Sequence, residues 1–144
     1  MIRHAGLVAL RIAGFWQGAL IEGPSGIGKS DLALRCLRDG FSLVADDRAL
    51  VWPSAGRLYG RAPDTLAGLI EARGLGVLPT SFLPMARISL VVACAAGPDA
   101  VDRLPASETA EILGVSLPLR RLWPLEPSAP AKLRLALEYL GRDL

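Results

Sequence analysis

The hydrophobic positions of the chain predict strands that alternate with helices. Apolar runs at residues 7–12 and 18–21 are short enough to be strands. After Lys29 the apolar residues recur at helical spacing until Gly40, a common helix terminator. Residues 41–45 then form a short apolar run that ends at two aspartates. This order of strand, loop, helix and strand is typical of an α/β fold with a ligand site at the start of the helix.

The rest of the chain continues the mixture of strands and helices. A hairpin is predicted with strands at 49–52 and 57–59, and the continuous apolar run at 88–94 indicates a strand buried on both faces. Helical periodicity predicts further helices at 105–113 and 129–140. Because no repeat or change of composition divides the sequence, we expect one domain over the whole 144-residue chain.

Composition narrows the class of protein further. Hydrophobic residues make up 51% of the chain and charged residues 21%, which is typical of a globular protein. A net charge of +2 gives no electrostatic reason to expect a nucleic acid or an anionic membrane as partner. The sequence also lacks an apolar stretch long enough to span a bilayer and a recognisable signal peptide. We therefore expect a cytoplasmic protein.

The clearest chemical motif lies between the second apolar run and the first predicted helix. It matches the pattern G-x-x-x-x-G-K-[ST] of a phosphate-binding P-loop, in which glycines let backbone N–H groups surround a phosphate. The lysine reaches the β- and γ-phosphates, and the serine hydroxyl is a ligand for Mg²⁺. The predicted phosphate-binding residues are Gly23, Pro24, Ser25, Gly26, Ile27, Gly28, Lys29 and Ser30.

Two adjacent carboxylates form a second candidate feature. Asp46 and Asp47 follow the strand after the P-loop helix, where ligands bind in open α/β sheets. Neighbouring residues of a strand face opposite ways, so the two carboxylates are expected to do different work unless the strand has already ended. One could bind Mg²⁺, and the other could act as a base on an attacking hydroxyl. A solvated turn is the alternative interpretation.

Four motifs in this order resemble the catalytic domain of bacterial HPr kinase/phosphorylase. They are Gly-Pro-Ser-Gly-Ile-Gly-Lys-Ser-Asp-Leu-Ala-Leu at 23–34, Leu-Val-Ala-Asp-Asp-Arg at 43–48, Gly-Arg-Ala-Pro at 60–63 and Ile-Glu-Ala-Arg-Gly-Leu-Gly-Val at 70–77. The last two are not general features of P-loop proteins, so the resemblance is specific. It covers about half of the chain.

The resemblance implies a fold, a reaction and a partner. The expected fold is an α/β P-loop domain similar to the nucleotide domain of phosphoenolpyruvate carboxykinase, with a mixed sheet and flanking helices. The implied reaction is phosphorylation of a serine of HPr, a small phosphocarrier protein, with ATP or pyrophosphate as donor and Mg²⁺ as cofactor. Many members of the family also remove this phosphate with inorganic phosphate. A homo-oligomer, by resemblance a hexamer, is expected.

The resemblance also implies roles for single residues. Asp46 is expected to be the general base on the serine and, with Lys29, to carry catalysis. Asp47 and Glu71 are expected to bind Mg²⁺ together with Ser30. Arg73 is a candidate phosphate contact, although Glu71 and Arg73 could instead form a structural ion pair.

A histidine near the N-terminus is a further candidate for the active site. His4 occupies the place where the family carries a histidine near its active site. Simple exposure near a chain end is an equally good interpretation of this residue.

The sequence departs from the family pattern in three places. The separate N-terminal domain of full-length members is absent from these 144 residues, and the C-terminal helical tail is short. A proline- and arginine-rich segment that supports nucleotide binding is not recognisable at 126–132. The chain is similar in these respects to the short form found in α-proteobacteria. Whether the dephosphorylating activity and the hexamer persist in such a chain stays open at this point.

Two other functions fit the same motifs. A kinase for a small metabolite on this scaffold would need a closed pocket with several arginine or polar side chains. An ATP-binding regulator of a sensor kinase pathway would bind nucleotide and partner with little turnover. A protein kinase, in contrast, should leave its γ-phosphate site open at the surface.

Overall fold

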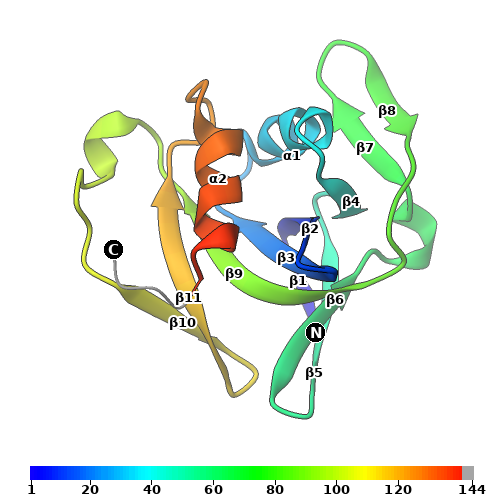
Figure 1. Ribbon diagram of the computed structural model, residues 1–144. Helices are drawn as coiled ribbons and strands as arrows, with labels where there is room; N and C mark the ends of the chain where they lie inside the picture. Colours follow the sequence, from blue (N-terminus) through cyan, green and yellow to red (C-terminus); the bar gives the residue numbers. More distant parts are fainter. Residues whose placement is uncertain (141–144) are drawn as a thin grey trace.

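The computed structural model describes residues 1–140 and shows a strongly curled mixed sheet with two α-helices packed on one face (Figure 1). The helices are α1 (Lys29–Arg38) and α2 (Ala129–Glu138), with short 3₁₀ turns η1 (Asp64–Leu66) and η2 (Pro98–Ala100). The strands are β1 (Ile2–Arg3), β2 (Ala5–Ile12), β3 (Phe15–Glu22), β4 (Ser42–Ala45), β5 (Ala49–Ser54), β6 (Arg57–Arg61), β7 (Leu69–Ala72), β8 (Gly76–Pro79), β9 (Ala86–Cys94), β10 (Glu108–Ile112) and β11 (Val115–Leu122).

Strand β9 organises the sheet. One of its edges pairs in parallel with β3, and the other pairs first with β6 and then, towards its C-terminal end, with β11. Beyond β3 lie β2 and β4, and beyond β6 lie β5 and β1. Strands β7 and β8 form a separate two-stranded ribbon that projects beside α1 (Figure 1). The mixed sheet with flanking helices that the sequence predicted is confirmed.

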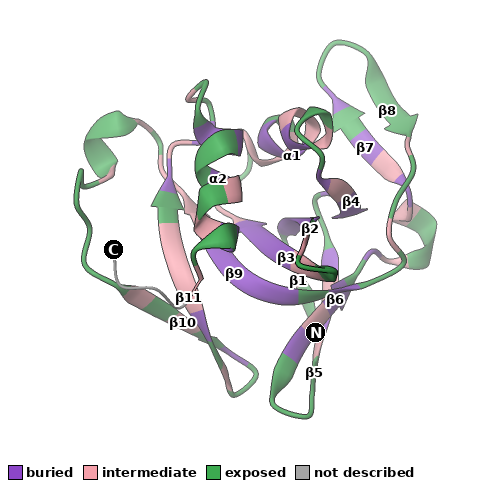
Figure 2. Ribbon diagram, in the orientation of Figure 1, coloured by how far each residue is buried: buried purple, intermediate pink, exposed green. Residues whose placement is uncertain are grey.

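Alternate side chains of the central strands enter two apolar cores, one on each face of the sheet. On β3, Ile21 packs in the core under the helices and Leu20 packs in the core on the opposite face, and both are fully buried. The first core is completed by Leu32 of α1 and Leu133 of α2. Burial follows this pattern, because the middle of the sheet is buried and the hairpin tips are exposed (Figure 2). The central strands therefore give the loops at their ends a fixed base.

The predicted P-loop unit is confirmed, with one strand inserted. Strands β3 and β4 are both antiparallel to β2, which lies between them, and α1 connects them across one face. Helix α1 ends where the sequence predicted, with Gly40 at a φ of 88° and the backbone N–H of Phe41 bonded to the carbonyl of Cys36. The C-terminal ends of β3 and β4 therefore face the start of α1.

The predicted hairpin, central strand and last helix are confirmed as β5–β6, β9 and α2, but the helix predicted at 105–113 is wrong. Residues Glu108–Ile112 form β10, which pairs with β11 through a tight turn at Leu113 and Gly114, both with positive φ. Ala106, Ala110 and Leu113 have the spacing of one helix face, but Ala106 and Leu113 are exposed in the structure. Pairing with β11 determines the conformation instead.

The two helices of residues 1–140 are each ten residues long, and neither could cross a membrane.

Candidate active site

The P-loop joins the end of β3 to the first turn of α1. Gly28 adopts a φ of 113°, which only glycine accepts without strain, and the backbone N–H of Leu32 bonds to its carbonyl at 3.0 Å as the helix begins. Helix N-termini carry free N–H groups and a positive partial charge. The loop therefore offers an anion a cradle of backbone donors at the start of α1.

The ammonium of Lys29 lies over this loop. Its Nζ donates to the carbonyl of Gly23 at 2.5 Å and to that of Pro24 at 3.1 Å. These contacts keep the positive charge at the loop on the side where a phosphate would bind, and an anion could replace the two neutral carbonyls as its partner.

Cys94 packs against the start of the P-loop. A Cβ added at Gly23 would lie 3.0 Å from the Cβ of Cys94 at the end of β9. Burial raises the pKa of the Cys94 thiol to about 11, although the charge of Lys29 acts in the opposite direction. The thiol therefore stays protonated near neutral pH and serves as a packing group for the P-loop.

The first aspartate of the pair links three elements of the site. One oxygen of Asp46 accepts the hydroxyl of Ser30 at 2.7 Å, and the other accepts the backbone N–H of Glu71 at 2.8 Å. The residue is only 8% exposed. Asp46 therefore fixes the P-loop serine and strand β7 relative to the end of β4.

The second aspartate has a different environment. Asp47 is exposed and adopts a φ of 66°, a left-handed conformation that aspartate tolerates better than most residues. Strand β4 has ended by this point, and the N–H of Arg48 bonds to the carbonyl of Asp46 at 2.7 Å. This turn directs the carboxylate of Asp47 into the cavity over the P-loop.

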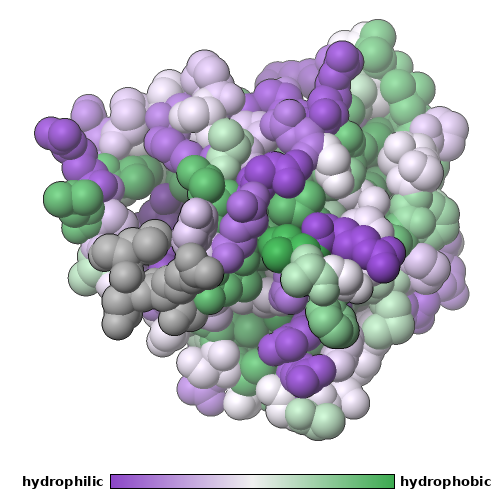
Figure 3. All heavy atoms as spheres, in the orientation of Figure 1, coloured by the Kyte–Doolittle hydropathy of each residue, from purple (hydrophilic) through white to green (hydrophobic). Residues whose placement is uncertain are grey.

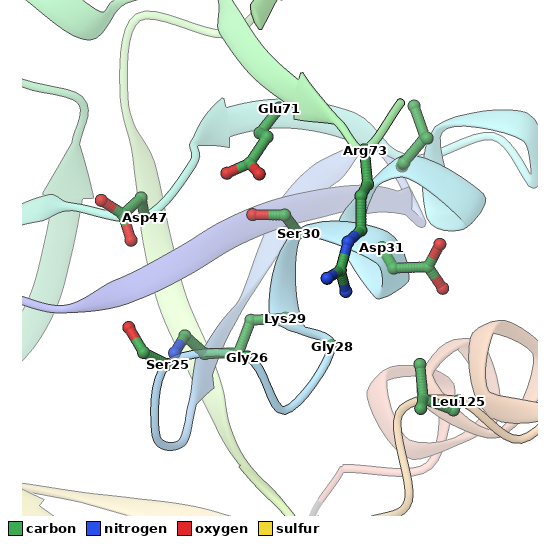
Figure 4. Close-up of a pocket in the computed structure, with 11 residues that line it drawn as sticks. Ser25, Gly26, Gly28, Lys29, Ser30, Asp31, Asp47, Glu71, Arg73 and Leu125 are labelled. Atoms are coloured by element: carbon green, nitrogen blue, oxygen red, sulfur yellow. The ribbon is translucent and has the colours of Figure 1, made fainter. Parts of the chain in front are cut away.

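That cavity has a volume of about 340 Å³ and collects most of the predicted site residues (Figure 4). Asp47 and Glu71 face it together with Arg73, opposite the P-loop. Neither Asp46 nor His4 lines it, and His4 is exposed between β1 and β2. The P-loop residues that line it are Ser25, Gly26, Gly28, Lys29 and Ser30.

Three lining residues were not foreseen. Asp31 and Leu34 lie on the exposed side of α1, and Leu125 comes from the turn before α2. The helical spacing from Ser30 would have pointed to Leu34, since residues four apart share a helix face. No sequence signal marks Leu125, because it meets the P-loop only through the fold.

The ribbon β7–β8 borders the cavity and exposes apolar side chains. Glu71 of β7 and Arg73 of the turn line the cavity, while the turn and β8 expose Leu75, Val77 and Leu78, of which Leu75 is 76% exposed. Figure 3 shows the hydrophobic surface that results over this part of the molecule. An apolar surface beside a polar cavity is typical of a contact region for a protein partner.

The polar groups of the cavity suit magnesium bound together with phosphates. Among residues 1–140, three or more His, Cys, Asp or Glu side chains nowhere cluster as an all-protein metal site would require. Mg²⁺ usually takes one or two carboxylates and several oxygens from substrate phosphates and water. The hydroxyl of Ser30 and the carboxylates of Asp47 and Glu71 line the cavity and could contribute to such a shell.

A P-loop between a strand and a helix, faced by an aspartate that follows the strand beyond, defines an α/β P-loop protein. Sequence similarity identifies the family of P-loop proteins to which the chain belongs. The chain belongs to the family described as "HPr Serine kinase C-terminal domain", whose model matches residues 2–129.

Individual relatives agree with this family. The chain is 38% identical over 137 residues to "HPr kinase/phosphorylase" of Bordetella pertussis, covering 88% of this chain and 44% of the relative. The match to the protein of the same name in Clostridium beijerinckii is 44% identical over 66 residues, covering 46% and 22%. The chain thus spans less than half of these relatives. A solved structure, "Hpr(Ser) kinase/phosphatase from Coxiella burnetii", superimposes with a TM-score of 0.78 at 25% identity, covering 94% of this chain and 92% of that one.

Proposed function

We propose that this chain is an ATP-dependent serine kinase whose acceptor is an HPr-type phosphocarrier protein. The observation that supports it best is the cavity in which the P-loop faces the carboxylate of Asp47, in a chain of this family. We also propose that the reaction takes place in the cytoplasm, and that the chain works as a homo-oligomer of the hexameric kind that the resemblance implies.

The residues of the P-loop and of the cavity have separate roles in phosphoryl transfer. The P-loop N–H groups and Lys29 hold the donor phosphates, and Ser30 binds the Mg²⁺ that accompanies them. Asp46, through its bond to the Ser30 hydroxyl, orients this metal ligand. Bound Mg²⁺–ATP supplies the transferable phosphoryl group and neutralises charge. Arg73 and Glu71 face the same space, where they contact the phosphates and the metal respectively.

We assign the role of general base to Asp47 instead of Asp46. The family resemblance implied Asp46 as the base, but both oxygens of Asp46 accept hydrogen bonds from the protein, whereas Asp47 lines the cavity. A base must reach the proton that it removes. Asp47 therefore accepts the proton of the serine hydroxyl as that oxygen attacks the γ-phosphorus and the bond to the β-phosphate breaks.

The shape of the site favours a protein acceptor over a small metabolite. Glu71, Arg73 and Asp47 are all exposed at the edge of the cavity, so the phosphates stay accessible from the surface. Arg73 is the one arginine among the lining residues, where a metabolite pocket would need several. The exposed apolar side chains of the turn and strand β8 of the ribbon offer additional area to a macromolecule.

The test is phosphoryl transfer from labelled ATP with Mg²⁺ to an HPr-type protein, with a serine-to-alanine acceptor as control. We expect label on the serine of the acceptor and none on the control. Label on small molecules alone would support a metabolite kinase. Tight ATP-dependent binding of the partner without transfer would support a regulator. Adding inorganic phosphate to the labelled product tests the reverse reaction.

A further inference from the structure

The cavity over the P-loop has a second end that the phosphates would not fill. On the side away from Asp47, its wall is formed by Leu125 and by Leu34 and Asp31 of α1, and Figure 4 shows Asp47 and Leu125 on opposite sides of Ser30. We call the part around residues 25–30 the phosphate end, and the part formed by Asp31, Leu34 and Leu125 the nucleoside end. Leu125 is 54% exposed and lines the cavity, so its side chain is open to a ligand bound there.

The turn that carries Leu125 is held by one arginine of α1. The guanidinium of Arg35 donates to the carbonyl of Glu126 at 3.0 Å and also to the carbonyl of Pro124, while its Nε donates to Asp31 at 2.9 Å. The two carbonyls belong to the residues on either side of Leu125. Its backbone is therefore fixed on both sides, and Asp31 orients the guanidinium that fixes it.

Contact with the P-loop sets how close Leu125 comes to the phosphates. A Cβ added at Gly28 would lie 2.8 Å from Cδ2 of Leu125, so the leucine side chain lies directly against the P-loop. Leu34 lies four residues after Ser30, about 6 Å further along the helix axis. Both leucines are thus placed by the same rigid helix that begins at the phosphate cradle.

We infer that the nucleoside of the phosphodonor packs on Leu125 and Leu34, and that Arg35 is the positioning residue that holds Leu125 for this contact. The inference rests on the proposed function only in taking a nucleoside triphosphate as donor. An apolar surface at a fixed distance from a phosphate cradle suits a ligand with an anionic chain at one end and a flat, weakly polar base at the other.

The experiment compares two ligands that both carry phosphates for the phosphate end, of which only one carries a nucleoside. Binding of Mg²⁺–ATP and of Mg²⁺–tripolyphosphate is measured by calorimetry for the wild type and for Leu125→Ser. We expect the wild type to bind ATP more tightly than tripolyphosphate. In Leu125→Ser the affinity for ATP should fall about tenfold, and that for tripolyphosphate should stay within about twofold, because the substitution removes only apolar contact with the nucleoside.

The matched control is Leu135→Ser on α2, since Leu135 is 53% exposed and does not line the cavity. It should leave both affinities unchanged.

Three results would overturn the inference. They are equal binding of ATP and tripolyphosphate by the wild type, parallel losses of both affinities in Leu125→Ser, and no loss at all. A wild type that binds ATP as expected but transfers no phosphate to an HPr-type protein would instead contradict the proposed function and leave the nucleoside contact supported. A wild type that does not bind ATP would overturn both.

Discussion

The two ends of the cavity are constructed in different ways. The phosphate end comes from one continuous loop, residues 23–30, that β3 and α1 hold in place. The nucleoside end brings α1 together with a turn 89 to 91 positions further along the chain, through the hydrogen bonds of Arg35. The phosphate end therefore depends on the backbone geometry of one loop, whereas the nucleoside end depends on side-chain contacts between segments that are distant in the sequence.

The largest effect is expected at the centre of the phosphate end. Lys29→Met should reduce phosphoryl transfer by about a thousandfold or more, because charge that develops on the transferred group loses its nearest cation. The measurement is the rate of label transfer from ATP to the acceptor protein at saturating Mg²⁺.

Lys132→Met is the matched control for Lys29, because Lys132 lies on α2, pairs with Glu126 and does not line the cavity. Its rate should stay within about twofold of the wild type, as expected for an exposed ion pair. Equal rates for the two variants would show that the phosphate end does not carry the reaction.

The next largest effect concerns the two adjacent aspartates. Asp47→Asn should lower kcat by about a hundred- to ten-thousandfold, because amides do not accept the proton of the attacking hydroxyl. Binding of Mg²⁺–ATP by calorimetry should change much less than kcat. If Asp47→Asn were nearly as active as the wild type, the assignment of the base to this residue would be wrong.

Asp46→Asn should weaken the binding of Mg²⁺, and its loss of transfer rate should be smaller than that of Asp47→Asn. The asparagine side chain keeps one acceptor oxygen but cannot balance the charge beside Ser30, so Mg²⁺ affinity should fall about ten- to a hundredfold. The check is a Mg²⁺ titration of transfer, in which high Mg²⁺ restores most of the rate. Failure of Mg²⁺ to restore activity would return the base to Asp46, as the family resemblance implied.

The phosphate end could be predicted because the residues that define it lie next to one another in the sequence. A P-loop has a fixed spacing of glycines, lysine and serine, and the helix and strands around it show their own periodicities. The apolar pattern also places Asp46 and Asp47 at the end of a strand, but their separate roles came only from the family resemblance. Their difference depends on β7, which brings the N–H of Glu71 to Asp46.

The errors lie where distant segments decide the structure. Residues 105–113 have a helical pattern of apolar side chains, but β11 provides backbone partners for Glu108–Ile112, and the turn at Gly114 brings the strands together. Pro118 is tolerated within β11 because it lies just before the segment that pairs with β9, so its missing N–H takes no bond from that pairing. Leu125 was missed because Arg35 reaches its turn only after folding.

The smallest effect is expected for Arg35, which connects α1 to the turn that carries Leu125. Arg35→Met should weaken ATP binding about threefold and leave tripolyphosphate binding unchanged, because Leu125 would become less ordered without being removed. Arg38→Met is the matched control, since Arg38 is an exposed arginine at the end of the same helix. Both variants are compared by calorimetry and by thermal unfolding.

A double variant shows whether Arg35 acts through Leu125. If it does, Arg35→Met combined with Leu125→Ser should bind ATP no more weakly than Leu125→Ser alone, because the contact that Arg35 positions is already gone. Additive losses would mean that Arg35 contributes to nucleotide binding by another route, for instance through Asp31 at the edge of the cavity. The cycle therefore separates a positioning role from a direct one, which a single substitution could not do.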